Sequence, residues 1–379
     1  MLVKVCLGIS SMKLSHSAES RYQDCGESYR LHYIEKLRPD FTTSALLFGD
    51  ALDKTHNAIL EDKRNDTLKS TEDYHVIFLK GWTHGTINKH PLYIPTSPKV
   101  LYSTKDFVVD LLTTEDYKLI DQGIEDGTFS AGDITEISYR KNQYGWNTLS
   151  EQEKSFHNLH CWLSMKNKAR YFIQGYIEQV LPRIKKVHAV QVKIDAANAA
   201  DNAFTGVVDF IADIDDHGTC IIDNKSSSAL YKHDSVRTSE QLAKYVYFEG
   251  PKYNTNKGAY IVTKKHLKTI ENKTCTVCGH TETSSHKTCN KMTGKKRCDG
   301  EWSIVATLEP VIQIIVDDIA ESFQEEAVIK VDKSFVTIDA GVFKKNLSKC
   351  SNWFGMRCPY SDLCHRNDAT GLVNVKDIK

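Results

Sequence analysis

The chain has few of the features that mark membrane or secreted proteins. No apolar run approaches the roughly 18 residues that a membrane-spanning helix needs, which argues against a membrane protein. The opening residues, MLVKVCLGIS, are apolar but too short for a signal-peptide core, and no clear cleavage site follows them. There is no excess of charge of either sign, because 49 Lys and Arg residues balance 49 Asp and Glu residues. Any nucleic-acid-binding surface must therefore be local.

Internal repeats, low-complexity tracts and a Walker A motif are also absent from the sequence. A helicase activity would therefore have to come from another protein. The 379 residues, 40% of them apolar, are enough for one large domain or two modest ones with a real core.

Cysteine, in contrast, is abundant. Eight of the eleven cysteines fall into two groups: Cys275, Cys278, Cys289 and Cys298, and then Cys25, Cys350, Cys358 and Cys364. In a long chain without an export signal, grouped cysteines bind metal more often than they form disulfides. We therefore expect a reducing compartment, the cytoplasm. The first group reads C-x2-C-x10-C-x8-C, a spacing typical of a tetrahedral Zn²⁺ site, in which His280 or His286 could replace one thiolate.

Apolar periodicity predicts an α/β or α+β fold, in which long helices are followed by strands around a central helix. Helices are expected over 16–37, 44–62, 149–186, 237–249 and 315–328, and strands over 187–194, 204–214, 218–226, 257–266 and 301–311. The helix over 149–186 opens with Ser150 and Glu153, a capping-box spacing. Residues 76–150 give no clear pattern.

Residues 206–225, GVVDFIADIDDHGTCIIDNK, place charges inside a predicted apolar hairpin. Strand side chains alternate faces, so Asp223 and Lys225 point the same way. A turn centred on Asp216 sets Asp209 opposite Asp223, and a two-residue loop would leave the pair diagonal but close. Two carboxylates are costly to bury together unless a cation joins them, and Mg²⁺ or Mn²⁺ takes oxygen ligands. The lysine could then orient a water or stabilise a pentacoordinate phosphorus.

The alternative for this segment is a hairpin with exposed charges on its outer face, since an Asp-x-Lys triplet alone is common. Asp213 and Asp215 are separated from Asp209 by even numbers of residues, so they would lie on the same face of the strand. They could be extra metal ligands, although we expect them to be solvated turn residues. Gln241 and Tyr245 follow on a predicted helix, four residues apart and therefore on one face. Both can hydrogen-bond phosphate or water, or they can form an ordinary pair at the edge of the core.

Together these residues resemble the PD-(D/E)XK nuclease superfamily, and its RecB-like branch in particular, which includes CRISPR-associated exonucleases and phage-encoded relatives. Gly206-Val-Val-Asp209 resembles the first metal-binding motif, Asp223-Asn224-Lys225 the (D/E)xK motif, and Gln241 to Tyr245 the QxxxY motif. The family's N-terminal Gly-x-x-x-His motif reads Gly49-Asp50-Ala51-Leu52-Asp53 here. Asp53 therefore stands where His is usual, and it could still bind the metal.

The resemblance implies a restriction-endonuclease-like core, a central mixed sheet flanked by helices, and metal-dependent hydrolysis of DNA. Carried over, Asp209 and Asp223 hold Mg²⁺ or Mn²⁺, the Asn224 carbonyl adds a ligand, and Lys225 acts on the water or the transition state. Gln241 and Tyr245 position the nucleic-acid strand.

The second cysteine group resembles the [4Fe–4S] staple of RecB-like nucleases, in which one N-terminal and three C-terminal cysteines tie the chain ends together. The tail of this chain reads C-x7-C-x5-C instead of the usual C-x2-C-x5-C. Zinc binding and simple burial of the cysteines remain alternatives.

Four segments are expected on this basis: a possible N-terminal extension over 1–11, a nuclease core over 12–273, a zinc-ribbon insertion over 274–300, and the remainder of the core over 301–379. The insertion lies between two predicted strands and should project as a ribbon. It carries five basic residues that suit phosphate contact, or that form a solvated face: Lys287, Lys291, Lys295, Lys296 and Arg297.

The expected function is that of a DNA exonuclease acting in DNA repair, recombination or phage DNA metabolism. It would act in a bacterial or infected-host cytoplasm, with a separate helicase or recombination protein as a possible partner. The alternatives are a non-catalytic DNA-binding or scaffold protein that keeps the fold, and an RNA nuclease. The intact set of Asp209, Asp223 and Lys225 argues against the scaffold, since an inactive relative would be free to lose it.

Overall fold

A computed structural model describes most of the chain. The described residues are 12–82, 86–87, 90–91, 99–101, 111–127, 132–144, 148–197, 203–283, 288–289, 291–293, 296–298, 300–350 and 357–375. The predicted extension over 1–11, together with His286, Lys287 and Lys295, lies outside them. Among the described helices, none is both long enough and apolar enough to cross a membrane.

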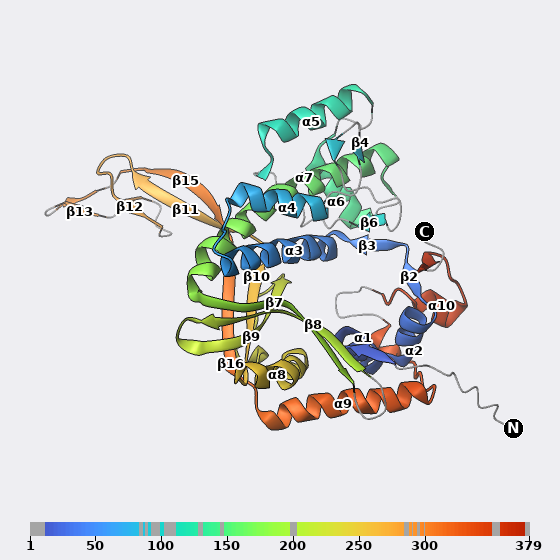
Figure 1. The fold of residues 1–379 in the computed structure, drawn as a ribbon. Coiled ribbons are helices and arrows are strands. Elements are labelled where there is room, and N and C mark those ends of the chain that lie inside the picture. Colours follow the sequence, from blue (N-terminus) through green and yellow to red (C-terminus); the bar gives the residue numbers. More distant parts are fainter. Residues whose placement is uncertain are drawn as a thin grey trace.

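A mixed sheet of six strands forms the centre of the molecule (Figure 1). Its strands are β1 (Lys13–Ser15), β7 (Ile184–Ala197), β8 (Ala203–Ile214), β9 (Gly218–Ser227), β10 (Lys257–Lys264) and β16 (Ile312–Asp318). The order is β1-β8-β9-β10-β16, with β7 paired to β8. Strands β9 and β10 run parallel, so their carboxyl ends meet at the same edge of the sheet.

Helices cover both faces of this sheet. One face packs against α3 (Ser44–Arg64), α4 (Thr71–Trp82) and α7 (Glu151–Gly175), and the other against α1 (His16–Asp24), α8 (Glu240–Tyr253) and α9 (Glu321–Asp339). Neighbouring strand residues alternate between the two cores: Ile222 lies in the first and Ile221 in the second. The predicted fold class, a central mixed sheet flanked by helices, is confirmed.

The long helix α7 begins where the sequence predicts. The side chain of Ser150 accepts from the backbone N–H of Glu153, and Glu153 returns the bond to the N–H of Ser150, so the capping box is complete. The helix continues through a π turn (Tyr176–Val180) and a 3-10 turn (Leu181–Arg183) into β7. Residues that gave no clear pattern form α5 (Thr114–Glu125), α6 (Ile134–Tyr144) and the short strands β4 (Thr86–Ile87), β5 (His90–Pro91) and β6 (Lys99–Leu101).

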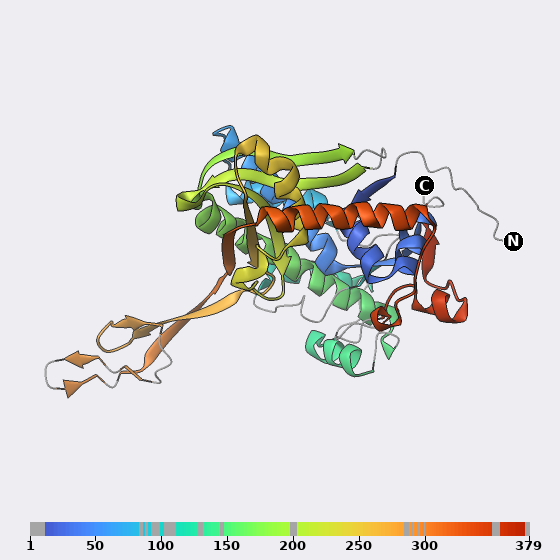
Figure 2. The same ribbon diagram turned by 90° about the horizontal axis from the view of Figure 1, so that it is seen from below.

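A long ribbon projects from the body of the molecule (Figures 1 and 2). It is built from β11 (Lys268–Cys275) and β15 (Trp302–Glu309), which pair antiparallel, with β12 (Thr281–Glu282) added to β11. A small hairpin of β13 (Met292–Thr293) and β14 (Lys296–Arg297) lies at its far end. The predicted insertion over 274–300 lies within this ribbon, and the predicted strand over 301–311 pairs with β11 instead of with the central sheet.

Two predicted helices differ from the structure. The helix predicted over 16–37 breaks at Cys25, whose backbone is extended, and continues as α2 (Gly26–Tyr29) and a π turn (Arg30–Ile34). The break accommodates a close approach, because a Cβ on Gly26 would lie 2.8 Å from the backbone nitrogen of Lys344. The helix predicted over 315–328 is wrong at its start, because its first residues belong to β16, which pairs with β10.

The two ends of the described chain lie together. Strand β17 (Leu372–Asn374) pairs antiparallel with β2 (Leu37–Pro39), which precedes β3 (Phe41–Thr43) and helix α3. Tyr360, just before α10 (Ser361–Arg366), donates from its hydroxyl to the Leu37 carbonyl at 3.0 Å. These contacts tie the C-terminal tail to the segment that leads into α3.

Candidate active site

The β8–β9 hairpin has the register that the sequence predicts. Phe210 pairs with Ile222 and Ala212 with Cys220, which centres the turn on Asp216. The next pair outward is Asp209 and Asp223, at the point where the two strands separate. The two carboxylates therefore face one another across the hairpin.

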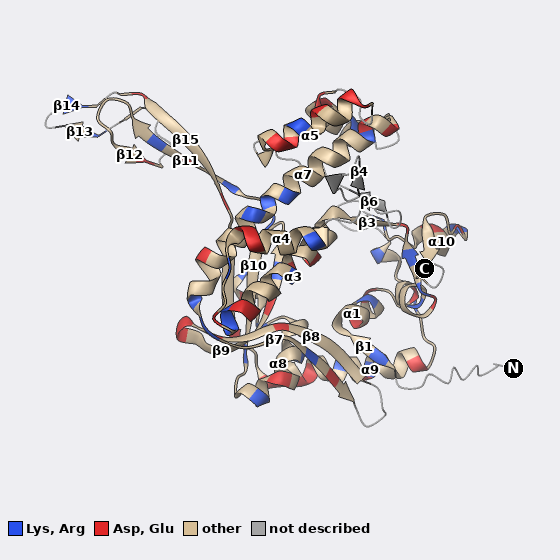
Figure 3. Cartoon of the chain, turned by 45° about the horizontal axis from the view of Figure 1, so that its top comes forward, with Lys and Arg blue, Asp and Glu red and all other residues tan. Residues whose placement is uncertain are grey.

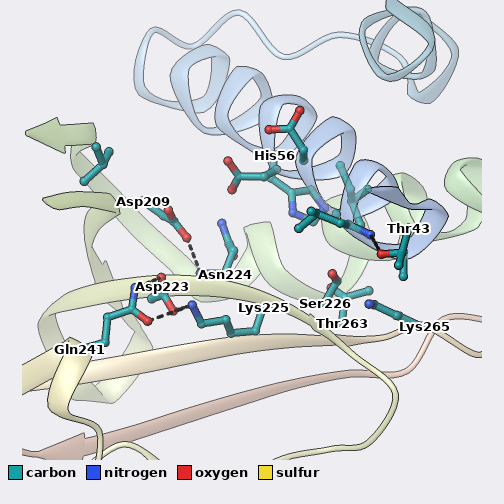
Figure 4. A pocket seen from close by; sticks show the side chains of 17 residues that line it. Thr43, His56, Asp209, Asp223, Asn224, Lys225, Ser226, Gln241, Thr263 and Lys265 are labelled. Carbon is teal, nitrogen blue, oxygen red and sulfur yellow. Dashed lines mark hydrogen bonds and ion pairs between the residues drawn. The ribbon is translucent and has the colours of Figure 1, made fainter. Parts of the chain in front are cut away.

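Hydrogen bonds fix both carboxylates (Figure 4). Asp209 Oδ2 accepts from the backbone N–H of Asn224 at 2.7 Å. Asp223 is 3% exposed, and its Oδ2 lies 2.5 Å from the Nζ of Lys225. Lys225 Nζ also donates to Gln241 Oε1 at 3.1 Å, so the lysine is held between the hairpin and helix α8.

Helix α8 brings Gln241 and Tyr245 to this hairpin. Gln241 Nε2 lies 3.4 Å from Asp223 Oδ1 and 3.1 Å from the Tyr245 hydroxyl. The Tyr245 ring packs against β8 at Gly206, where a Cβ would lie 2.8 Å from the ring. A residue with a side chain at position 206 would therefore push this ring away. Gln241 lines the pocket described below, whereas Tyr245 reaches it only through Gln241.

An ion pair buried behind α8 connects this helix to α1. Lys244 is 0% exposed and pairs with Glu19, which is 1% exposed. Lys244 Nζ also lies 3.3 Å from His16 Nδ1 and 3.9 Å from a carboxylate oxygen of Glu240. Because Lys244 lies between Gln241 and Tyr245 in the sequence, the pair fixes the stretch of helix that presents them.

Helix α3 closes the other side of a pocket of about 650 Å³. It contributes Asp53 and His56 to the pocket lining. His56 lies across the pocket from Asp209 and Asp223 (Figure 4). Asn57 on the same helix donates to Asp53 at 3.0 Å. The structure therefore brings Asp53 into the same pocket as the hairpin carboxylates.

The electrostatics of the pocket favour a bound cation. Burial, together with the negative charges of Asp223 and Asp53, raises the pKa of Asp209 to about 8. Burial also raises the pKa of Asp53 and the pKa of Asp223. Lys225 supplies one positive charge; burial lowers its pKa, but the charge of Asp223 outweighs that effect and raises it overall. Four carboxylates line the pocket, those of Asp50, Asp53, Asp209 and Asp223, against the two ammonium groups of Lys225 and Lys265. The pocket is therefore acidic, and its oxygen donors suit Mg²⁺ or Mn²⁺.

His56 is a pocket residue that the sequence analysis missed. It is 3% exposed, and its ring stacks on Tyr176 with centroids 3.9 Å apart. Burial lowers the pKa of His56 to about 3, so the imidazole is neutral. Within the described part of the chain, its Nε2 has no hydrogen-bond partner. Its position one helical turn after Asp53 is the signal that could have identified it.

Asn224 contacts both sides of the pocket. Its backbone N–H bonds Asp209, and its side-chain Oδ1 accepts from the Tyr176 hydroxyl at 3.4 Å. Its carbonyl remains a predicted metal ligand. Asp213 and Asp215 lie outside the pocket lining, as the sequence led us to expect: Asp213 accepts from His188 at 2.8 Å, and Asp215 pairs with Arg183 at 3.1 Å.

The ribbon cysteines form a compact four-thiol cluster. The ligand atoms of Cys275, Cys278, Cys289 and Cys298 all lie within 4.8 Å of one another. The sulfur atoms of Cys275 and Cys298 are 3.6 Å apart, as are those of Cys278 and Cys289. Tetrahedral Zn–S bonds of about 2.3 Å place sulfur atoms about 3.8 Å apart, so the cluster could hold such an ion.

The surroundings of this cluster also suit thiolates. The backbone N–H of Cys278 lies 3.5 Å from Cys275 Sγ and lowers the pKa of that thiol to about 6. A Cβ on Gly300 would lie 2.6 Å from the same sulfur, so only glycine fits there. His280 is not part of the cluster, and its ring lies near Trp302.

The second cysteine group lines a cavity of about 1000 Å³ between α1 and the C-terminal tail. Cys25, Cys350, Cys358 and Cys364 all contribute to its wall. The backbone N–H of Asn346 lies 3.4 Å from Cys25 Sγ, and that of Cys358 donates to the Cys350 carbonyl at 2.7 Å. Among the described residues, only the ribbon group has all its ligand atoms within 4.8 Å of one another. The thiols of the cavity are therefore spread more widely than those of the ribbon.

Comparisons with known proteins give one clear result. A family model for the PD-(D/E)XK nuclease superfamily matches residues 140–365, more than half of the chain. No curated protein matches significantly. Among solved structures, "Crystal structure of SSO0001" is 12% identical and covers 67% of this chain and 97% of its own, with a TM-score of 0.24. That score is too low to add to the argument.

Proposed function

Because the chain belongs to the PD-(D/E)XK nuclease superfamily, whose members are metal-dependent nucleases, we propose that it is a DNA exonuclease that depends on Mg²⁺ or Mn²⁺. The observation that supports this proposal most directly is the convergence of three carboxylates and Lys225 in one pocket. The substrate would be processed in DNA repair, recombination or phage DNA metabolism, in the cytoplasm, with a separate helicase or recombination protein as partner.

In this proposal Asp53, Asp209 and Asp223 hold the metal, with the Asn224 carbonyl as a further ligand. The neutral His56 nitrogen faces the same pocket and could complete the set. A bound divalent ion supplies Lewis-acid polarisation of the phosphoryl group and activation of a water.

The remaining roles belong to side chains around the metal ligands. Lys225 keeps its charge because Asp223 faces it, and Gln241 fixes the position of its ammonium group. An ammonium held in this way can orient the attacking water and stabilise negative charge on the phosphoryl oxygens. Tyr245 supports Gln241 from behind, so its proposed role is positioning.

The cysteine groups receive separate metals in this proposal. The compact ribbon cluster suits Zn²⁺, and the wider group around Cys25 suits a [4Fe–4S] cluster, whose thiolates bind different iron atoms. Metal analysis and visible absorbance of anaerobically purified protein would test both assignments. Zinc in both sites, with no iron, would refute the cluster and leave the nuclease proposal standing.

The decisive experiment is digestion of end-labelled linear DNA, covalently closed circular DNA and RNA of the same sequence, with Mg²⁺ or Mn²⁺ and with EDTA. We expect metal-dependent loss of linear DNA only. Cleavage of closed circles would indicate an endonuclease, and cleavage of RNA alone would support the RNA nuclease.

Variants connect this activity to the pocket. Asp223→Ala and Lys225→Ala should abolish cleavage while circular dichroism and DNA binding change little. Asp216→Ala, in the exposed turn of the same hairpin, is the matched control and should cut normally. Unchanged cleavage by both pocket variants would exclude the proposed site. Wild-type protein that binds DNA but cuts nothing would favour the scaffold alternative.

A further inference from the structure

The ribbon is rooted beside the pocket. Thr263 and Lys265, at the end of β10, line the pocket together with Lys225 and Ser226 at the end of the parallel strand β9 (Figure 4). The first ribbon strand, β11, begins only three residues later, at Lys268. A polymer that lies across the pocket therefore passes close to the base of the ribbon.

The ribbon extends well beyond this base. Strand β11 has eight residues, which at about 3.3 Å per residue span about 26 Å. Most of β15 is exposed, including the neighbouring residues Ile304 and Val305, which are 52% and 60% exposed. Such a narrow ribbon is marginally stable by itself, so the four-thiol cluster near its far end serves to order the tip.

The tip carries a group of basic side chains. Lys291, Lys296 and Arg297 are all exposed, and none forms an ion pair with another described residue. Figure 3 shows strand β14 in the colour of Lys and Arg. Lys296 and Arg297 form strand β14, opposite Thr293 and Met292. The whole chain has a net charge of zero, yet the sequence between Glu282 and Asp299 contains five basic residues and no acidic one. The positive charge is therefore concentrated at the tip.

We propose that the ribbon tip binds the phosphate backbone of the DNA substrate, away from the catalytic pocket. This inference rests on the proposed nuclease function and adds a second contact to it. Concentrated cations suit phosphates, which attract them independently of sequence. The length of β11 alone corresponds to about 8 base pairs at about 3.4 Å each, and the tip lies at the far end of the ribbon. A short duplex held at the pocket cannot reach the tip, whereas a long one can.

The test compares duplexes of about 6 and about 30 base pairs by fluorescence anisotropy, using the full chain with Asp223→Ala to prevent cleavage. The tip variant combines Lys291→Gln, Lys296→Gln and Arg297→Gln. The matched control removes three exposed lysines on other elements, Lys185, Lys186 and Lys333. None of these six side chains is a cluster thiol, so zinc content and circular dichroism should stay unchanged.

We expect the tip variant to bind the long duplex at least about tenfold more weakly, with the slope of log affinity against log salt reduced by about 2 to 3. Binding of the short duplex should not change, and the control should behave like the parent. Equal loss on both duplexes would contradict the proposed reach. If the tip variant binds the long duplex as tightly as the parent does, the proposal is overturned. The basic residues of the tip would then be a solvated face or a protein-binding surface.

The two proposals fail in different ways. If the otherwise wild-type protein cleaves DNA but the tip substitutions leave long-duplex binding unchanged, only this inference is overturned. If tip-dependent binding is found but the wild-type protein cleaves no nucleic acid, the DNA contact is supported and the nuclease proposal is not.

Discussion

The buried pair of Lys244 and Glu19 offers a quantitative test of how helix α8 is held against α1. Both side chains are almost completely excluded from solvent, and they join α8 to α1. Replacing Glu19 with Leu leaves a buried ammonium whose remaining neighbours are His16 and the more distant Glu240. Removing one partner of a buried ion pair typically costs about 3–5 kcal/mol, because the other charge loses its compensation. We therefore expect Glu19→Leu to lower the free energy of unfolding by about 3–5 kcal/mol.

The double variant Glu19→Leu, Lys244→Met should behave differently. Replacing both charges by apolar side chains of similar volume is often neutral or stabilising by about 1–4 kcal/mol. The double variant should therefore be more stable than either single variant, which gives a coupling energy of several kcal/mol. Urea unfolding at neutral pH, monitored by circular dichroism for all four proteins, measures this cycle.

A cleavage assay completes the test. If the pair only holds α8 in place, the double variant should keep most of its activity, because Gln241 keeps its contacts with Asp223 and Lys225. The exposed pair of Lys54 and Asp50 is the matched control, and its cycle should give less than about 1 kcal/mol. A coupling energy below about 1 kcal/mol for Glu19 and Lys244 as well would show that the pair is hydrated. It would refute the argument that each of these two buried charges depends on the other.

Further predictions concern the pocket and the metal sites. Burial raises the pKa of Asp209 to about 8. Between about pH 4 and 8 the folded metal-free protein therefore keeps a proton on Asp209 that the unfolded chain has released. The free energy of unfolding of the metal-free protein should fall as the pH rises through this range. Metal binding should release that proton, so the metal affinity should rise about tenfold per pH unit below pH 8. Calorimetry in buffers of different ionisation enthalpy measures the released proton. Asp209→Asn should remove both the proton release and the pH dependence of the affinity. Asp53→Ala and His56→Ala should each weaken Mn²⁺ binding by about 10- to 100-fold, whereas Lys54→Ala on the same helix should not; normal affinity in the His56 variant would remove that residue from the site. Cys25→Ser should lower the melting temperature of the whole protein and bleach any visible absorbance, whereas Cys278→Ser should affect mainly the ribbon; equal effects would contradict two separate sites.

The hairpin was predictable because its information is local. Alternation with period two and the short turn around Asp216 fix which residues of β8 and β9 face each other. The same is true of the capping box that starts α7. These signals lie within a few residues of the structure they determine, so a single sequence is enough to find them.

Other features depend on residues far away in the sequence. The break at Cys25 exists because the segment around Lys344 packs against Gly26, which an amphipathic pattern cannot indicate. The run before Glu321 is a strand because β10 provides a partner. His56 looks like any buried helical histidine until the fold places it opposite Asp209 and Asp223. Pairing between distant segments decides each of these cases.

The pairing of β17 with β2 has a consequence for biosynthesis. Strand β2 leads into the helix that carries Asp53, but its partner strand is translated more than 330 residues later. At about 5–20 residues per second, this interval lasts roughly 15–65 s on the ribosome. The N-terminal segment must therefore remain without its partner strand until β17 has been made. We expect the two ends to join only then, so that this part of the fold is among the last to form in a newly synthesised molecule.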